Sequence, residues 1–326
     1  MKSVSVHNFP SESYLSEPVF LDEKYILLCP DIPITEELKQ RLLTWGISRI
    51  FTDGSPTSGP PQSIAVGEER ETPSETPAGI LESNIKEKEK REEVQKFFSA
   101  TSQFLAKIFE RYLTKNEIHI GEVSEKIKEI ITMVKNNRKH LLRLTDFETD
   151  EQNYISSHSV KTAIIALVLA DVLKLPHFKQ IEVGLAGLFH EIGMLRIPPQ
   201  LYMTKKQLTP QEKQTINAHT VLGFRILKDL SFPMTVTRAV LEHHERIDGS
   251  GYPRGLTGDK IAFYAKILAA ACSYVAIVSD RPHREAADGH TGMMELLKNT
   301  GKHYDEQIIR LLVYCLSIYP IGTFVL

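Results

Sequence analysis

The second half of the chain is patterned throughout for α-helices. From residue 151 onward apolar positions recur three and four residues apart, and no stretch shows the alternation of a half-buried strand. Two further patterns of helical spacing precede this region, across 97–112 and 123–141. We therefore expect a mainly α protein, with connecting helices in 93–150 and an all-helical bundle in 151–326.

The N-terminal stretch has a different texture. Apolar runs at 19–21, 25–30 and 47–51 are typical of short strands, and an amphipathic helix is predicted across 35–45. We expect residues 1–54 to form a small α/β or α+β domain with a regulatory or interaction role. Residues 55–92 collect Ser, Pro, Gly, Thr and Glu and end in a run of Lys and Glu. Because this segment has little apolar surface to bury, it predicts a linker whose end becomes helical.

Composition narrows the functional classes. Of 326 residues 42 % are hydrophobic and 25 % charged, and the formal net charge is −2. These values are ordinary for a soluble protein and leave no basic surface for nucleic acid or for an anionic membrane. No apolar run approaches membrane-spanning length, and three cysteines, Cys29, Cys272 and Cys315, are too few for a disulfide scaffold. We expect a cytoplasmic protein with reduced thiols and with neither nucleic acid nor membrane as a partner.

Candidate chemistry is concentrated in the helical region. Residues 243–253 are His-His-Glu-Arg-Ile-Asp-Gly-Ser-Gly-Tyr-Pro, which joins two histidines to a glycine-rich turn. His158, the pair His190-Glu191 and His219 lie upstream in otherwise apolar sequence. One histidine on an apolar helix is usually a hydrogen-bonded core residue, whereas several histidines with a carboxylate are the ligand types of a transition-metal site. The cluster therefore predicts a metal-dependent hydrolase.

Helix start and stop signals place these side chains. Residues 209–212, Thr-Pro-Gln-Glu, form a capping box with proline at the first helical position, so a helix beginning there would have His219 in its third turn. Gly193 predicts a C-cap for the helix that contains the apolar run 181–189. The two adjacent histidines of the glycine-rich motif would diverge by about 100° on a helix, so we expect them to span a cleft.

These motifs, in this order and spacing, resemble the HD-GYP domain family. The resemblance covers about 151–326 and includes the segments 279–284 and 319–323. Such domains belong to the all-helical HD superfamily of metal phosphohydrolases. The resemblance implies hydrolysis of the bacterial second messenger cyclic di-GMP to linear pGpG, and often onward to GMP.

The resemblance also implies site residues. The expected metal ligands are imidazoles, a carboxylate and a thiol: His158, His190, Glu191, His219, His243, His244 and Cys272. Glu191 would bridge two ions, and with His190 it forms the expected catalytic pair. One or two iron, manganese or zinc ions suit these ligands and would orient a hydroxide toward a phosphodiester.

Substrate contacts are expected in the glycine-rich motif and in two basic segments. They are Asp248, Gly249, Gly251, Tyr252, Lys205, Arg281 and Arg284. The glycines would let the backbone approach the ligand, and the guanidinium groups would contact phosphate and guanine. Lys205 would replace the lysine of the family, whose position is Thr204 here.

Several positions depart from the pattern of the family. Glu191 stands for an aspartate and is one methylene longer, and Met194 stands for a lysine. Cys272 and Val275 stand for two aspartates of one helix. A thiolate can bind zinc or iron, whereas a cysteine on an alanine-rich helix is more often inert packing, so both interpretations of Cys272 stay open. Tyr154 stands for the glutamate of a third metal site, so three ions are not expected.

Two hypotheses follow. In the first, the protein is a cyclic di-GMP phosphodiesterase slowed by its altered metal shell. In the second, a catalytically degenerate domain binds the dinucleotide as a sensor or serves as a protein-interaction module. The retained histidines and glycine-rich motif favour turnover, and the changes at Met194, Cys272 and Val275 favour the alternative. The expected partners are cyclic di-GMP and signalling proteins. The sequence leaves open whether the chain forms a homo-oligomer.

Overall fold

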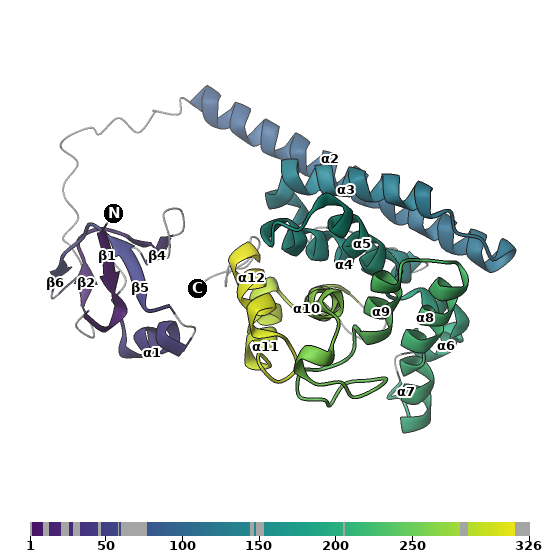
Figure 1. Ribbon diagram of the computed structural model, residues 1–326. Coiled ribbons are helices and arrows are strands. Elements are labelled where there is room, and N and C mark those ends of the chain that lie inside the picture. Colours follow the sequence, from purple (N-terminus) through teal and green to yellow (C-terminus); the bar gives the residue numbers. More distant parts are fainter. Residues whose placement is uncertain are drawn as a thin grey trace. The chain divides into compact units, whose positions relative to one another are not determined.

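The computed structural model describes residues 2–8, 13–20, 26–28, 33–44, 47–57, 59, 77–143, 147, 153–204, 206–280 and 286–316. The chain divides into two compact units, Met1–Pro77 and Ala78–Leu326 (Figure 1). Each unit has its own apolar core. The fold is therefore mainly helical with a small sheet-containing unit, as the hydrophobic pattern predicts.

The first unit is built on antiparallel strands. Its elements in chain order are β1 (Lys2–Ser5), β2 (Tyr14–Leu15), β3 (Val19–Phe20), β4 (Ile26–Leu28), α1 (Glu36–Thr44), β5 (Arg49–Thr52) and β6 (Pro56–Thr57). One sheet has the order β1-β5-β3-β4, and β2 pairs with β6. Because every pairing is antiparallel, the unit is α+β and not α/β. Strand β1 was not predicted, since its sequence Lys-Ser-Val-Ser has too little apolar alternation to stand out.

The described elements of the second unit are helical. In chain order they are α2 (Pro77–Lys115), α3 (Ile120–Leu141), α4 (Tyr154–Val172), α5 (His177–Phe189), the 3-10 helix η4 (Ile192–Arg196), α6 (Pro199–Tyr202), α7 (Pro210–Asn217), α8 (His219–Asp229), α9 (Met234–Glu242), the 3-10 helix η5 (Gly258–Lys260), α10 (Phe263–Ile277), α11 (Gly289–Lys298) and α12 (Glu306–Leu316).

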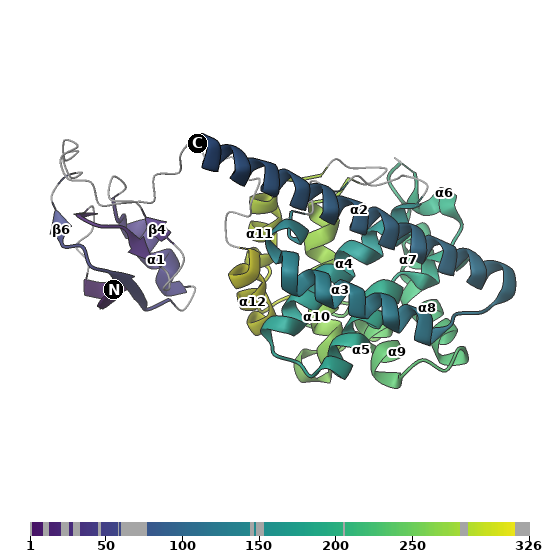
Figure 2. The ribbon, with the colours of Figure 1, turned by 90° about the horizontal axis from the view of Figure 1, so that it is seen from above.

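Helices α2 and α3 form an antiparallel pair along one side of this unit (Figure 2). Arg111 Nη1 lies 2.6 Å from Glu122 Oε2 near the turn that joins them, and Lys139 Nζ lies 3.3 Å from Glu87 Oε1 toward the other end. Helix α2 begins at Pro77, within the stretch 55–92 that we expected to be a linker with a helical end. The Lys and Glu run at 86–92 is thus part of a long helix.

Helix α4 is the centre of the second unit. It packs against α3, α5, α10 and α12. Contrary to our expectation that no apolar run approaches membrane-spanning length, α4 is long and apolar enough to cross a membrane, but 83 % of that apolar window is buried inside the protein. A helix that is apolar on all sides and covered by other helices is a core helix. Gly187 of α5 permits the closest contact, because a Cβ there would lie 2.7 Å from Ala163 Cα of α4.

One buried cation on α4 predicts how stability depends on pH. Lys161 is 2 % exposed, and its Nζ donates to Phe147 O at 3.2 Å and to Ser279 Oγ at 3.3 Å. Burial lowers the pKa of Lys161 from 10.5 to about 8, and the charge of Asp280 opposes this shift. Above that pH the unfolded chain keeps a proton that the folded chain has lost, so folding becomes more favourable as pH rises.

We expect the free energy of unfolding to rise by about 1.4 kcal/mol per pH unit through this one group between about pH 8 and about pH 10. Urea unfolding of the wild type and of Lys161→Met at several pH values isolates the contribution, because other titrating groups are common to both proteins. A difference between the two proteins that does not change over this window would contradict the low pKa.

Candidate metal centre

The expected ligands come from six helices, counting the 3-10 helix η4, and from their ends. His158 lies on α4, His190 is the C-cap of α5, and Glu191 follows it as the N-cap of η4. His219 is the first residue of α8 and His243 is the C-cap of α9, with His244 next to it. Cys272 lies on α10. Helix ends dominate this set, which suits a site that borders a cleft.

Local structure differs from the sequence expectation around His219. The capping box is present, with Thr209 and Glu212 bonded to each other's backbone N–H. However, α7 ends at Asn217 and a new helix begins at His219, so this histidine does not lie in the third turn of one helix. After this break α8 packs along η4, the segment that follows Glu191.

Gly193 and the adjacent histidines also differ from expectation. Helix α5 ends at Phe189, and Gly193 lies inside η4, where it is not a C-cap. A Cβ at Gly193 would overlap the carbonyl oxygen of His219, so glycine is required for η4 to approach α8. The ring centroids of His243 and His244 lie 4.2 Å apart, so the two side chains lie close together at the end of α9 and do not diverge as we expected.

The ligand atoms gather in two groups that share one carboxylate. Within each group they all lie within 4.8 Å of one another. One group is His158, His190, Glu191 and Cys272, and the other is Glu191, His219, His243 and His244. The resemblance implied two ions bridged by Glu191, and Glu191 is the residue that the two groups share.

Distances within the groups leave room for ions. Glu191 Oε1 lies 3.9 Å from His158 Nε2 and 3.8 Å from His190 Nε2, and Glu191 Oε2 lies 3.7 Å from His219 Nε2. The Nε2 atoms of His219 and His243 are 3.4 Å apart. Two nitrogen ligands of one tetrahedral zinc ion, each bonded at about 2.0–2.1 Å, are separated by about 3.4 Å. The separations between these ligand atoms are long for hydrogen bonds, but they are suitable for atoms that bind the same ion.

Backbone carbonyls orient three of the imidazoles. In each, Nδ1 donates to the carbonyl oxygen three residues earlier, which leaves the Nε2 lone pair facing the group. The pairs are His190 with Gly187 (2.8 Å), His219 with Ile216 (2.7 Å) and His243 with Val240 (2.7 Å). Nε2 of His190 is buried and has no hydrogen-bond partner. Because buried acceptors normally have a partner, an unpartnered imidazole nitrogen at this place is consistent with a metal ligand.

Burial keeps the deepest imidazoles neutral. It lowers the pKa of His190, and it lowers the pKa of His243 well below its ordinary value, with the neighbouring histidines adding to the effect. Neutral imidazole is the form that binds a metal. Burial also raises the pKa of Tyr252, whose ring stacks on His244 at 4.8 Å. Its phenol therefore stays protonated and can donate a hydrogen bond beside the second group.

The glycine-rich motif folds back on itself. Asp248 is exposed, and its carboxylate accepts hydrogen bonds from the backbone N–H and the hydroxyl of Ser250 at 2.9 and 2.7 Å, which lower its pKa. Gly249 has φ +80°, a conformation that favours glycine. A Cβ on Gly251 would lie 2.5 Å from His244 O, so the protein's own backbone already requires glycine there. Lys205, Arg281 and Arg284 lie outside the described residues.

Two buried carboxylates beside the histidine pair were missed from sequence. Glu245 is 2 % exposed, and its two oxygens accept the backbone N–H groups of Arg254 and Leu256, each at 2.8 Å. Glu242 is fully buried and accepts from Arg238 Nε at 2.7 Å, from Ala262 N at 2.6 Å and from the Arg254 guanidinium. They fix the glycine-rich loop against α9. The only sequence signal was their place on either side of the two histidines.

Removing the Glu245 carboxylate should loosen this loop. We expect Glu245→Ala to lower the free energy of unfolding by about 1–3 kcal/mol, since two backbone N–H groups lose their acceptor. Urea unfolding measures the change. Glu306→Ala removes an exposed glutamate that pairs with Arg310 within its own helix, and it should change stability by no more than about 0.5 kcal/mol. Equal effects of the two substitutions would contradict the role of Glu245.

The structure shows what surrounds four of the positions at which the sequence departs from the family pattern, Tyr154, Met194, Cys272 and Val275. Tyr154 replaces the glutamate of a third metal site, and its ring stacks on His158 with centroids 6.0 Å apart. Met194 and Val275 are buried, Val275 within the apolar core of the unit, and neither offers a ligand atom for a hard metal. Cys272 is different, because its Sγ lies 3.5 Å from His158 Nε2.

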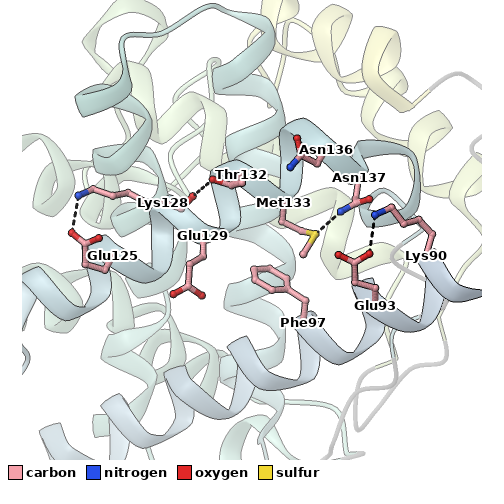
Figure 3. A pocket seen from close by; sticks show the side chains of 10 residues that line it. All are labelled: Lys90, Glu93, Phe97, Glu125, Lys128, Glu129, Thr132, Met133, Asn136 and Asn137. Atoms are coloured by element: carbon pink, nitrogen blue, oxygen red, sulfur yellow. Dashed lines mark hydrogen bonds and ion pairs between the residues drawn. The ribbon is translucent and has the colours of Figure 1, made fainter.

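A cavity of about 530 Å³ lies between α2 and α3, away from these ligands (Figure 3). Four of its charged groups form two pairs, Lys90 with Glu93 at 2.8 Å and Lys128 with Glu125 at 2.7 Å, and its Glu129 pairs with Lys126. Asn137 donates to the sulfur of Met133. This cavity holds no cluster of histidines or metal-ligand carboxylates, so the candidate chemistry stays with the two ligand groups.

Comparisons with known proteins bear on the family of this chain. The HD domain family matches residues 107–308. A cyclic di-GMP phosphodiesterase of Pseudomonas aeruginosa is 30 % identical over 287 residues, which are 88 % of this chain and 69 % of the relative. The cyclic di-GMP phosphodiesterase PdeB of Borreliella burgdorferi is 31 % identical over 173 residues, which are 53 % of this chain and 46 % of that protein.

A solved structure shares the architecture. It is an HDG"Y"P protein from Bdellovibrio bacteriovorus, with a TM-score of 0.55 and 15 % identity, and the match covers 95 % of this chain and 97 % of that one. At this identity the likeness concerns the fold alone. The family match over most of the helical unit, together with the relative from Pseudomonas aeruginosa, establishes that the chain belongs to the HD domain family, as an HD-GYP domain.

Proposed function

We propose that this protein is a metal-dependent phosphodiesterase that opens cyclic di-GMP to linear pGpG and acts further on that product to give GMP. One observation carries the proposal: Glu191 belongs to both groups of ligand atoms, so a single carboxylate can bridge two ions. The relatives named for cyclic di-GMP hydrolysis support the choice of substrate.

Each residue has a task in this reaction. Divalent ions at such a site lower the pKa of a bound water and neutralise charge on the phosphodiester. Glu191 would hold both ions, with His158 and His190 on one side and three histidines on the other. Backbone carbonyls hold His190 and His243 with Nε2 toward the site, and burial keeps these rings unprotonated at neutral pH. The ligand types suit iron, manganese or zinc.

The motif loop and the first unit complete the proposal. Tyr252, stacked on His244, would border the substrate, and Asp248, Gly249 and Gly251 shape the loop that contains it. Lys205, Arg281 and Arg284 stay proposals as substrate contacts. The N-terminal unit would act as a regulatory or protein-contact module, and the protein would work in the cytoplasm, where a bacterial second messenger acts.

A second function has a specific observation in its favour. Met194 stands where a lysine would meet phosphate, and Val275 is a core residue where a second aspartate would lie. With these groups absent, the same site would bind cyclic di-GMP without turnover and serve as a sensor.

Metal analysis coupled to turnover separates the two functions. Protein purified without chelator should contain iron, manganese or zinc and should convert cyclic di-GMP to pGpG when Mn²⁺ or Fe²⁺ is added, as chromatography of the products would show. His243→Ala should lose both metal and turnover, whereas His177→Ala, an exposed histidine at the start of α5, should keep them. Nucleotide binding without any product, in protein loaded with metal, would establish the sensor.

A further inference from the structure

One ligand group differs from the other in its chemistry. Cys272 is 5 % exposed, and its Sγ lies 3.5 Å from His158 Nε2. The sulfur also lies within 4.8 Å of the ligand atoms of His190 and Glu191. The second group contains only nitrogen and oxygen ligands.

The separation of sulfur and nitrogen fits a shared ion. A tetrahedral zinc ion with a Zn–S bond of about 2.3 Å and a Zn–N bond of about 2.0–2.1 Å holds its two ligand atoms about 3.5 Å apart. A thiol that donates to an imidazole would give a similar distance, so a second observation is needed. The buried Nε2 of His190, which has no hydrogen-bond partner, supplies it, because it belongs to the same group of ligand atoms as the sulfur.

We propose that Cys272 is a thiolate ligand, and that it makes the two halves of the centre chemically unequal. The group with Cys272 would take zinc, ferrous iron or cobalt in preference to manganese, because thiolate is a soft ligand. The group with His219, His243 and His244 would accept any of these ions. On binding, the thiol proton leaves to solvent and a sulfur–metal bond forms, with no change in oxidation state. This inference rests on the metal centre of the proposed function.

Cobalt(II) alone is a direct probe of this bond. A thiolate bound to cobalt gives a near-ultraviolet charge-transfer absorption that nitrogen and oxygen ligands do not give. Metal-free full-length protein titrated with Co²⁺ should develop this band. The background variant Cys29→Ser with Cys315→Ser, in which Cys272 is the remaining thiol, should develop it equally. Cys315 is a suitable control because its Sγ contacts Arg138 on α3 and takes no part in either ligand group.

Cys272→Ser should then abolish the band and leave one bound ion fewer per chain at equal free cobalt. Cys272→Asp should keep the full number of ions without the band and should shift the preference of that position toward manganese, since carboxylate is a harder ligand. These three variants separate a ligand from a packed thiol, because packing predicts unchanged metal content.

The outcomes distinguish this inference from the proposed function. A charge-transfer band without hydrolysis of cyclic di-GMP would support the thiolate ligand while the phosphodiesterase activity fails. Hydrolysis by a protein that shows no band, and that keeps its metal content in Cys272→Ser, would overturn the thiolate ligand and leave the activity in place.

Discussion

Glu191→Gln should abolish turnover of cyclic di-GMP and strip the protein of bound metal. Glu191 is the one residue common to both ligand groups, with its two oxygens 3.7–3.9 Å from three imidazole nitrogens. An amide keeps the size of the side chain but removes the negative charge that two cations would share. A loss of about 4 kcal/mol of transition-state stabilisation corresponds to a rate about a thousandfold lower, and we expect at least that.

Turnover rates and the metal content of the purified protein measure this effect together. Glu125→Gln is a matched control, because Glu125 is exposed on α3 and pairs with Lys128 far from the ligands. A Glu191→Gln protein that keeps its metal and more than a tenth of the wild-type rate would exclude the bridging role.

Gly193→Ala should have the largest effect on folding. The added Cβ would overlap His219 O and lie 2.7 Å from Gly223 N, and both obstacles are backbone atoms of α8 that cannot rotate away. Relief requires η4 and α8 to separate, which would also move Glu191 away from His219. Overpacking of a core commonly lowers the free energy of unfolding by about 1–3 kcal/mol. Because the opposing atoms are backbone and cannot rotate away, we expect Gly193→Ala to lower it by about 3 kcal/mol.

Urea unfolding and metal content measured on the same protein test this prediction. Gly121→Ala is the control, since a Cβ there meets no atom within 4 Å and the residue lies in the first turn of α3. Alanine should stabilise that helix by up to about 1 kcal/mol. Similar stability changes of the same sign in both variants would show that η4 and α8 are not tightly packed.

Sequence alone predicts the helical unit and much of its centre, for physical reasons that can be named. The nearly uniform apolar sequence of α4 indicates a buried helix, and in the structure it packs against four other helices. The capping box at 209–212 marks the start of α7, because both of its hydrogen bonds are local. Ligand types and their order identify the residues around Glu191, although periodicity cannot show that they converge.

Features that depend on distant partners were not predictable in this way. Glu245 bonds to backbone groups nine and eleven residues later, and Gly251 is required by the backbone of the preceding motif residues. The helix break before His219 follows from the packing of α8 on η4, which no local signal announces. Strand β1 depends on pairing with β5, across most of the first unit.

Anomalous X-ray scattering from crystals of the protein, measured on both sides of the absorption edge of the bound metal, tests the centre most directly. We predict two peaks a few ångströms apart on either side of the Glu191 carboxylate, one beside His158 and Cys272 and one beside His219 and His243. Crystals of protein saturated with metal that show no peak within bonding distance of these side chains would contradict the account.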